Sequence, residues 1–154
     1  MRTLKTMMMI FVLSSMSLTI SCSSDDDSSS SGTAATIAAI ETNMESGSWR
    51  ITYYFDSDHE ETDHFNSYVF VFEDDGTLTA SNAASTHTGA WSVTNSNSRT
   101  TDDDVDFNIA FSTPADFVEL TDDWDIITYN SNRIELIDVS GGGGGTDYLT
   151  FEKN

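Results

Sequence analysis

Apolar and polar residues alternate with a period of two over most of the chain after residue 48. The segment DVDFNIAF at 104–111 is one example, because its Val, Phe, Ile and Phe residues occupy every second position. Successive side chains of a β-strand point to opposite faces, so this pattern predicts strands with one buried and one solvated face. A helix, whose apolar residues recur every three or four positions, does not fit the pattern.

Short turns separate about eight such segments, which makes the predicted fold all-β. The segments are WRITYYF (49–55), the two halves of SYVFVFEDDGTLTAS (67–81), HTGAWSV (87–93), DVDFNIAF, WDIITY (124–129), RIELIDV (133–139) and DYLTFEK (147–153). Consecutive strands joined by short turns favour an up-and-down antiparallel barrel of roughly eight strands. A two-sheet β-sandwich is the alternative, because periodicity does not distinguish the two architectures.

Two short helices are predicted beside the strands. Ile37, Ile40 and Met44 follow helical spacing in an alanine-rich segment that precedes Gly47. In STPADFVEL, near 114–120, Thr113 is the expected N-cap and Pro114 the expected first helical residue of about two turns.

In the first strand, alternation places Trp49, Ile51, Tyr53 and Phe55 on one face.

Residues 1–21 have the composition of a secretory signal peptide. Arg2 and Lys5 precede an apolar stretch from Met7 to Ile20, which is shorter than the about 18–20 residues of a spanning helix. The cysteine that follows, Cys22, resembles the acylated cysteine of a bacterial lipobox. The resemblance implies that Cys22 carries a lipid anchor; cleavage nearby that leaves a free thiol is the alternative.

Residues 22–33 are rich in serine and aspartate and cannot supply a core, so we expect a disordered tether before a domain at 34–154. The residues directly after the cysteine resemble the export signal of certain Gram-negative lipoproteins: Ser23, Ser24, Asp25, Asp26 and Asp27. This resemblance implies a surface-exposed protein that is held in the outer membrane by the lipid on Cys22.

Two Gly-x-Trp segments, GSW at 47–49 and GAW at 89–91, are similar to the signatures of small lipocalin-like domains. The resemblance covers about 36–154 and implies a barrel in which Trp49 packs across one end. Aromatic residues of such a barrel either fill the core or line a pocket for a small apolar ligand. The candidate ligand-binding residues are Tyr53, Phe70, Trp91, Phe107 and Trp124.

A carbohydrate-binding sandwich with structural calcium is the alternative function, and it requires Trp91 and Trp124 to be exposed for stacking on sugar rings. The chain has 26 acidic and 6 basic residues and a net charge of −20, which excludes nucleic acid as a partner. No Gly-x-Ser-x-Gly motif is present, and the glycine run at 141–145 lacks the Lys-Ser/Thr ending of a phosphate loop. We therefore expect no catalysis and no cofactor; the oligomeric state does not follow from the sequence.

Three acidic segments are candidates for cation binding. DSDHEETDH at 56–64 holds His59 and His64 among carboxylates, a donor set that suits a divalent metal. TDDDVD at 101–106 and TDDWD at 121–125 lack the order of an EF-hand loop. A solvated acidic loop is the alternative for each segment, and we expect no dedicated metal site.

Overall fold

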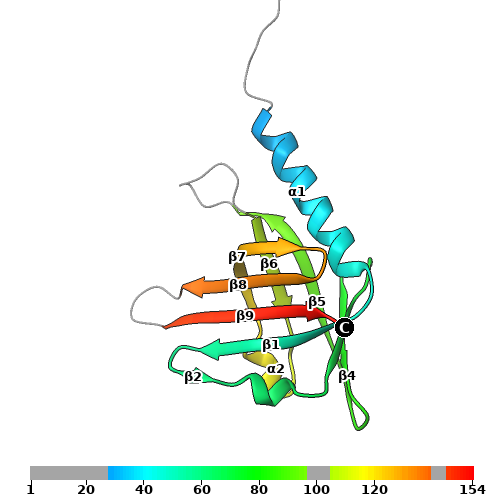
Figure 1. Cartoon of the computed structure of the whole chain (residues 1–154), viewed down its shortest axis with the longest axis vertical. Coiled ribbons are helices and arrows are strands. Elements are labelled where there is room, and N and C mark those ends of the chain that lie inside the picture. The colour runs from blue at the N-terminus through cyan, green and yellow to red at the C-terminus, as the bar shows by residue number, and fades with distance from the viewer. Residues whose placement is uncertain (1–27, 97–104, 140–144) are drawn as a thin grey trace, which may run out of the picture.

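The computed structural model describes residues 28–96, 105–139 and 145–154 (Figure 1). The predicted signal peptide, Cys22 and the expected export residues 23–27 lie outside the described residues. The elements are α1 (Ser28–Glu45), β1 (Trp49–Asp56), β2 (His59–Glu60), the 3-10 helix η1 (Thr62–Phe65), β3 (Val69–Phe72), β4 (Thr77–Ser81), β5 (Thr86–Asn95), β6 (Val105–Ala110), α2 (Ala115–Val118), β7 (Asp122–Asn130), β8 (Arg133–Val139) and β9 (Thr146–Lys153).

Eight strands form one closed antiparallel barrel. The order around it is β1-β3-β4-β5-β6-β7-β8-β9, and hydrogen bonds between β1 and β9 close the ring. The two-residue strand β2 forms a hairpin with the end of β1. The predicted all-β, up-and-down barrel with two short helices is confirmed, and the architecture is not the alternative β-sandwich.

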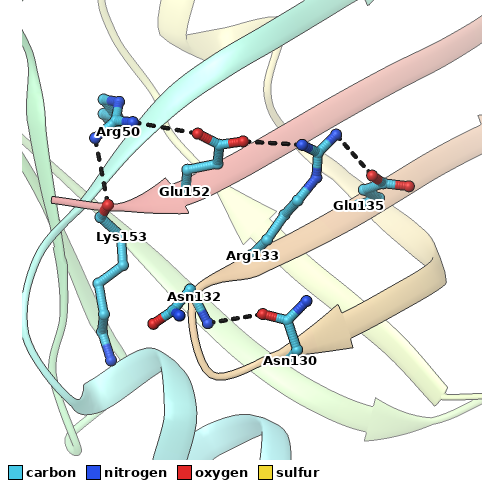
Figure 2. Close-up of polar contacts among 7 residues, drawn as sticks. All are labelled: Arg50, Asn130, Asn132, Arg133, Glu135, Glu152 and Lys153. Carbon is cyan, nitrogen blue, oxygen red and sulfur yellow. Dashed lines mark hydrogen bonds and ion pairs between the residues drawn. The ribbon is translucent and has the colours of Figure 1, made fainter.

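The β1–β9 seam is the closure of the barrel, and charged side chains cross its outer face (Figure 2). Arg50 Nη2 lies 3.2 Å from Glu152 Oε2, whose other oxygen lies 2.9 Å from Arg133 Nη1. Arg133 Nη2 then reaches Glu135 Oε1 at 2.7 Å. These side chains are partly exposed, so each pair contributes at most about 1 kcal/mol. Glu152 of β9 links Arg50 of β1 to Arg133 of β8, whereas the Arg133–Glu135 pair lies within β8.

A bulge in the middle of β1 reverses which side chains of the strand are buried and which are exposed. Ile51 pairs with Phe151 and Tyr53 with Thr150, so a β-bulge at Thr52 adds one residue to β1. Beyond the bulge Tyr54 is buried and Tyr53 is 41% exposed. The predicted inward position of Tyr53 and Phe55 is therefore wrong, because one extra residue moves every later side chain to the other face.

α1 covers one end of the barrel, where β1 begins and β9 ends; we call this the α1 end (Figure 1). The helix contacts β3, β5 and β6, and it buries Ile40 and Met44 as the helical spacing predicted. Trp49 is fully buried there, and its Nε1 donates a hydrogen bond to the Met44 carbonyl at 2.8 Å. α1 begins at Ser28, so residues 28–33, which the sequence predicted to be part of a disordered tether, are helical. A helix tolerates serine because each serine costs only about 0.5 kcal/mol relative to alanine, and here an alanine-rich segment continues the helix.

α2 lies at the opposite end of the barrel, which we call the α2 end (Figure 1). Pro114 is the N-cap and has extended backbone angles, with φ −72° and ψ −177°. Helical geometry therefore begins only at Ala115, and α2 has one turn. The predicted N-cap role of Thr113 and the second turn are wrong for this reason.

Candidate functional site

The interior of the barrel is filled with aromatic side chains. The ring of Phe72 lies 5.2 Å from that of Trp91 and 5.8 Å from that of Phe107, both in edge-to-face contact, and Phe70 meets Phe151 at 5.3 Å. Such contacts are typical of a packed core. The space inside the barrel is thus occupied by the protein's own side chains.

Four of the five candidate ligand-binding residues belong to this core. Phe70 and Phe107 are fully buried, and Trp91 and Trp124 are 6% and 1% exposed. The indole Nε1 atoms of the two tryptophans donate to backbone carbonyls, at 2.9 Å to Glu73 and 3.1 Å to Leu120. The fifth candidate, Tyr53, lies on the outer face of β1. The structure therefore brings four of the residues together as packing partners and leaves Tyr53 apart.

A groove at the α1 end is large enough to hold a small ligand. It lies between α1 and β7 and has a volume of about 480 Å³. Its lining residues are Thr36 and Ile40 of α1, Val105 of β6, and Asp125, Ile126, Ile127, Thr128 and Tyr129 of β7. None of the five candidates from the sequence lines it.

The course of β7 explains why a groove forms here. The ladder between β6 and β7 runs from Ile109↔Asp122 to Asp106↔Asp125, whereas β7 itself continues to Asn130. A register shift between Ile126 and Thr128 places a bulge in the same stretch. Ile126 and Tyr129 pack against the core on either side of this bulge, and α1 crosses above them. Apolar and polar side chains therefore both face the groove.

The groove has the size of a small-molecule site, and its lining is of mixed polarity. Pockets that bind small ligands measure about 300–1,000 Å³ and combine an apolar lining with a few polar groups. Here Ile126, Ile127 and Tyr129 supply apolar surface, and Thr36, Asp125 and Thr128 supply polar groups. Ile40 and Val105 contribute little, because they are only 1% and 8% exposed. Sequence reasoning identified the apolar face of α1 but not the groove, because nothing local in the sequence shows where the helix docks on the barrel.

A second cluster lies at the α2 end. Glu61, His64 and Glu119 each place a potential ligand atom within 4.8 Å of those of the other two. His64 Nδ1 lies 3.6 Å from Glu61 Oε2, and this oxygen is buried without a hydrogen-bond partner. A buried acceptor without a hydrogen bond costs roughly 1–3 kcal/mol, so this oxygen favours a positive or donating group closer than the His64 ring.

Burial and neighbouring negative charges raise pKa values in and beside this cluster. Burial, followed by the negative charge of Glu61, raises the pKa of the Glu119 carboxyl above its usual value. Burial and then the surrounding carboxylates raise the pKa of Tyr54, whose hydroxyl donates to the Glu119 carbonyl at 3.0 Å. The neutral phenol is thus the form that ties β1 to the end of α2.

The structure separates the two histidines of the 56–64 segment. His64 joins Glu61 and Glu119, whereas His59, on β2, forms an ion pair with Asp58. The sequence pointed to this segment, but it could not supply Glu119, because that residue follows α2 more than fifty positions later. Of TDDDVD, residues 101–104 lie outside the described residues; TDDWD overlaps the start of β7.

These features define a closed up-and-down β-barrel with a filled interior, a groove at one end and a cluster of ionisable residues at the other. No family model matches the chain, and the comparison with curated proteins finds no match. Among solved structures, the chain is similar to the crystal structure of a DUF4847 family protein from Bacteroides vulgatus. The two share 20% identity over 75% of this chain and 97% of that one, with a TM-score of 0.47. Among the described residues, no helix combines the length and apolar character needed to cross a membrane.

Proposed function

We propose that this protein is a non-catalytic, lipid-anchored surface protein of the outer membrane that binds a small apolar molecule in the groove between α1 and β7. The groove itself is the observation that carries the proposal, because its volume of about 480 Å³ suits a small ligand and Ile126, Ile127 and Tyr129 give it an apolar side. The resemblance of the N-terminal segment to a lipobox and an acidic export signal supports the anchor and the location.

The charge of the protein narrows the class of ligand. Asp125 lies at the rim of the groove, and the chain as a whole carries a net charge of −20. A like-charged head group is repelled by such a field. The proposed ligand is therefore neutral or cationic, and the hydroxyls of Thr36 and Thr128 are available to its polar end.

The burial of the tryptophans argues against the carbohydrate-binding alternative. That function needs Trp91 and Trp124 on the surface, where their rings stack on sugars. Both side chains are buried and donate to backbone carbonyls. A binding site at the α1 end leaves these residues in the core.

Ligand binding in the groove is tested by placing a large side chain in it. The neutral fluorescent probe N-phenyl-1-naphthylamine is titrated into the full chain and into two variants of α1, Thr36→Trp and Thr42→Trp. Thr36 lines the groove, whereas Thr42 is exposed on the same helix outside that lining. We expect Thr36→Trp to weaken probe binding at least tenfold and Thr42→Trp to leave it unchanged. Equal binding by all three proteins would place the probe elsewhere and remove the basis of the proposal.

The anchor and the export signal are tested separately in cells. We expect Cys22→Ala to abolish incorporation of labelled fatty acid and to release the protein from the membrane. Replacing Asp25, Asp26 and Asp27 by alanine should keep the label but remove the protein from the reach of protease added to whole cells. Lipid labelling that persists in Cys22→Ala contradicts the anchor, and unchanged protease access contradicts the export signal.

A further inference from the structure

We propose that Glu61, His64 and Glu119 form a binding site for a divalent transition-metal ion of the zinc class at the α2 end of the barrel. Glu61 is the N-cap of η1, His64 lies in η1, and Glu119 is the C-cap of α2; their ligand atoms lie within 4.8 Å of one another. The site lies at the end of the barrel opposite the groove and is independent of the function proposed for the groove.

The donor set is appropriate for such an ion. Zinc binds imidazole nitrogens and carboxylate oxygens at about 2.0–2.2 Å, which in a tetrahedral site places ligand atoms about 3.4 Å apart. The distance of 3.6 Å between His64 Nδ1 and Glu61 Oε2 is already close to this value. His64 and Glu119 are exposed, so their side chains have room to close the remaining distance and to leave a coordination position open to water.

The buried oxygen of Glu61 is a second observation that points to an ion. Glu61 Oε2 is itself inaccessible to solvent, although the side chain as a whole is 26% exposed, and the His64 ring that pairs with it lies at 3.6 Å, beyond hydrogen-bond distance. A ligand atom of Glu119 lies within 4.8 Å of those of Glu61 and His64, so two carboxyl groups and one imidazole converge on one point. A metal ion at the centre of the three ligands satisfies this oxygen and offsets the repulsion between the two carboxylates.

The backbone holds the three residues in place before any ion binds. The Glu61 amide donates to the Tyr54 carbonyl at 2.9 Å, and the His64 amide donates to the Glu61 carbonyl at 3.0 Å. The Tyr54 hydroxyl donates to the Glu119 carbonyl at 3.0 Å. Tyr54, on β1, is therefore a positioning residue that fixes η1 and the end of α2 relative to each other.

The test is a calorimetric titration of Zn²⁺ into the full chain with Cys22→Ala, which removes the thiol as a competing ligand. It is run in excess Ca²⁺, which occupies weak sites on the acidic surface. We expect one ion per chain. His64→Ala and Glu119→Gln should each weaken the affinity at least tenfold, whereas His59→Ala, in the same segment but outside the cluster, should leave it unchanged.

Thermal unfolding gives a second readout, because an ion that binds only the folded chain raises the unfolding temperature. We expect Zn²⁺ to raise it for the parent protein and for His59→Ala but not for Glu119→Gln. His64 and Glu119 are exposed, so the circular dichroism of their variants without metal serves to verify folding. Absence of one-to-one binding, or an equal loss in His59→Ala, would overturn the proposal.

Discussion

At the residue scale, Asp122 shows how burial and neighbouring carboxylates together change the pKa of one side chain. It opens β7, and burial, followed by its side-chain hydrogen bond with Asp123 and the negative charge of Asp138, raises its pKa to about 6 from 3.8, although the hydrogen bond from the Asp123 amide acts in the opposite direction. The folded state therefore binds this proton more tightly than the unfolded state, and the free energy of unfolding falls as pH rises from about 4 to about 6. We expect Asp122→Asn to raise the unfolding temperature at pH 7 and to have no effect below about pH 3.5.

Asp75 provides a control of opposite sign. Hydrogen bonds from the Thr77 side chain and backbone lower the pKa of Asp75, so its carboxylate stabilises the fold above the ordinary pKa, and that contribution is lost as pH falls. Asp75→Asn should lower the unfolding temperature at pH 7. Thermal unfolding followed by circular dichroism from pH 3 to pH 8 measures both variants. A profile for Asp122→Asn that runs parallel to the parent at every pH would contradict the assignment.

Gly89 is constrained by the lack of room for a side chain. A Cβ at this position would lie 2.5 Å from the Ala110 carbonyl oxygen and 2.7 Å from Cδ1 of Phe111. This close approach gives a structural reason for the glycine of the second Gly-x-Trp segment. We expect Gly89→Ala to lower the free energy of unfolding by about 1–3 kcal/mol, as measured by urea denaturation. Gly32→Ala, in open space on α1, should instead raise it by up to about 1 kcal/mol.

At the element scale, the bulge in β1 decides which of two adjacent tyrosines supports the core. Tyr54 is buried and meets the Phe65 ring edge-on at 5.5 Å, whereas Tyr53 is exposed. We expect Tyr54→Ala to cost about 3–5 kcal/mol in urea denaturation and Tyr53→Ala less than about 1 kcal/mol. Similar losses in the two variants would mean that β1 does not have this register.

The same element shows what a single sequence can and cannot predict. Alternation predicted β6 correctly because Val105, Phe107 and Ile109 keep one period through a strand without a bulge. In β1 the period breaks at Thr52, and the break depends on the register with β9, about a hundred residues away. Strand positions are thus local properties, whereas the choice of the buried face after a bulge is not.

The two sites differ from the sequence predictions for a related reason. An aromatic residue in a strand has the same local pattern whether it lines a pocket or fills a core, so the sequence could not place the groove. The groove exists because α1 docks beside the end of β7, and the acidic cluster exists because α2 brings Glu119 to Glu61 and His64. Both are products of tertiary packing between segments that are distant along the chain.

At the scale of the whole molecule, the distribution of charge is uneven. Three of the six basic residues, Arg50, Arg133 and Lys153, lie near the β1–β9 seam at the α1 end, where the first two pair with Glu152. Lys153 lies over the Trp49 ring, 5.2 Å from its centroid. The 26 acidic residues far outnumber the six basic ones, so the folded chain concentrates negative charge that the unfolded chain spreads out.

Salt should therefore stabilise this barrel. The Debye length falls from about 30 Å at 0.01 M to about 8 Å at 0.15 M, so salt screens repulsion between distant carboxylates. It also weakens the ion pairs of the β1–β9 seam, but these exposed pairs contribute at most about 1 kcal/mol each. Repulsion within a chain of net charge −20 outweighs them, and we expect the unfolding temperature at pH 7 to rise with NaCl over this range. Near pH 4.1, where the net charge vanishes, the repulsion is absent and the rise should disappear or reverse. An unfolding temperature that falls with salt at pH 7 would mean that the seam pairs, and not the surplus of carboxylates, dominate the electrostatic free energy of the fold.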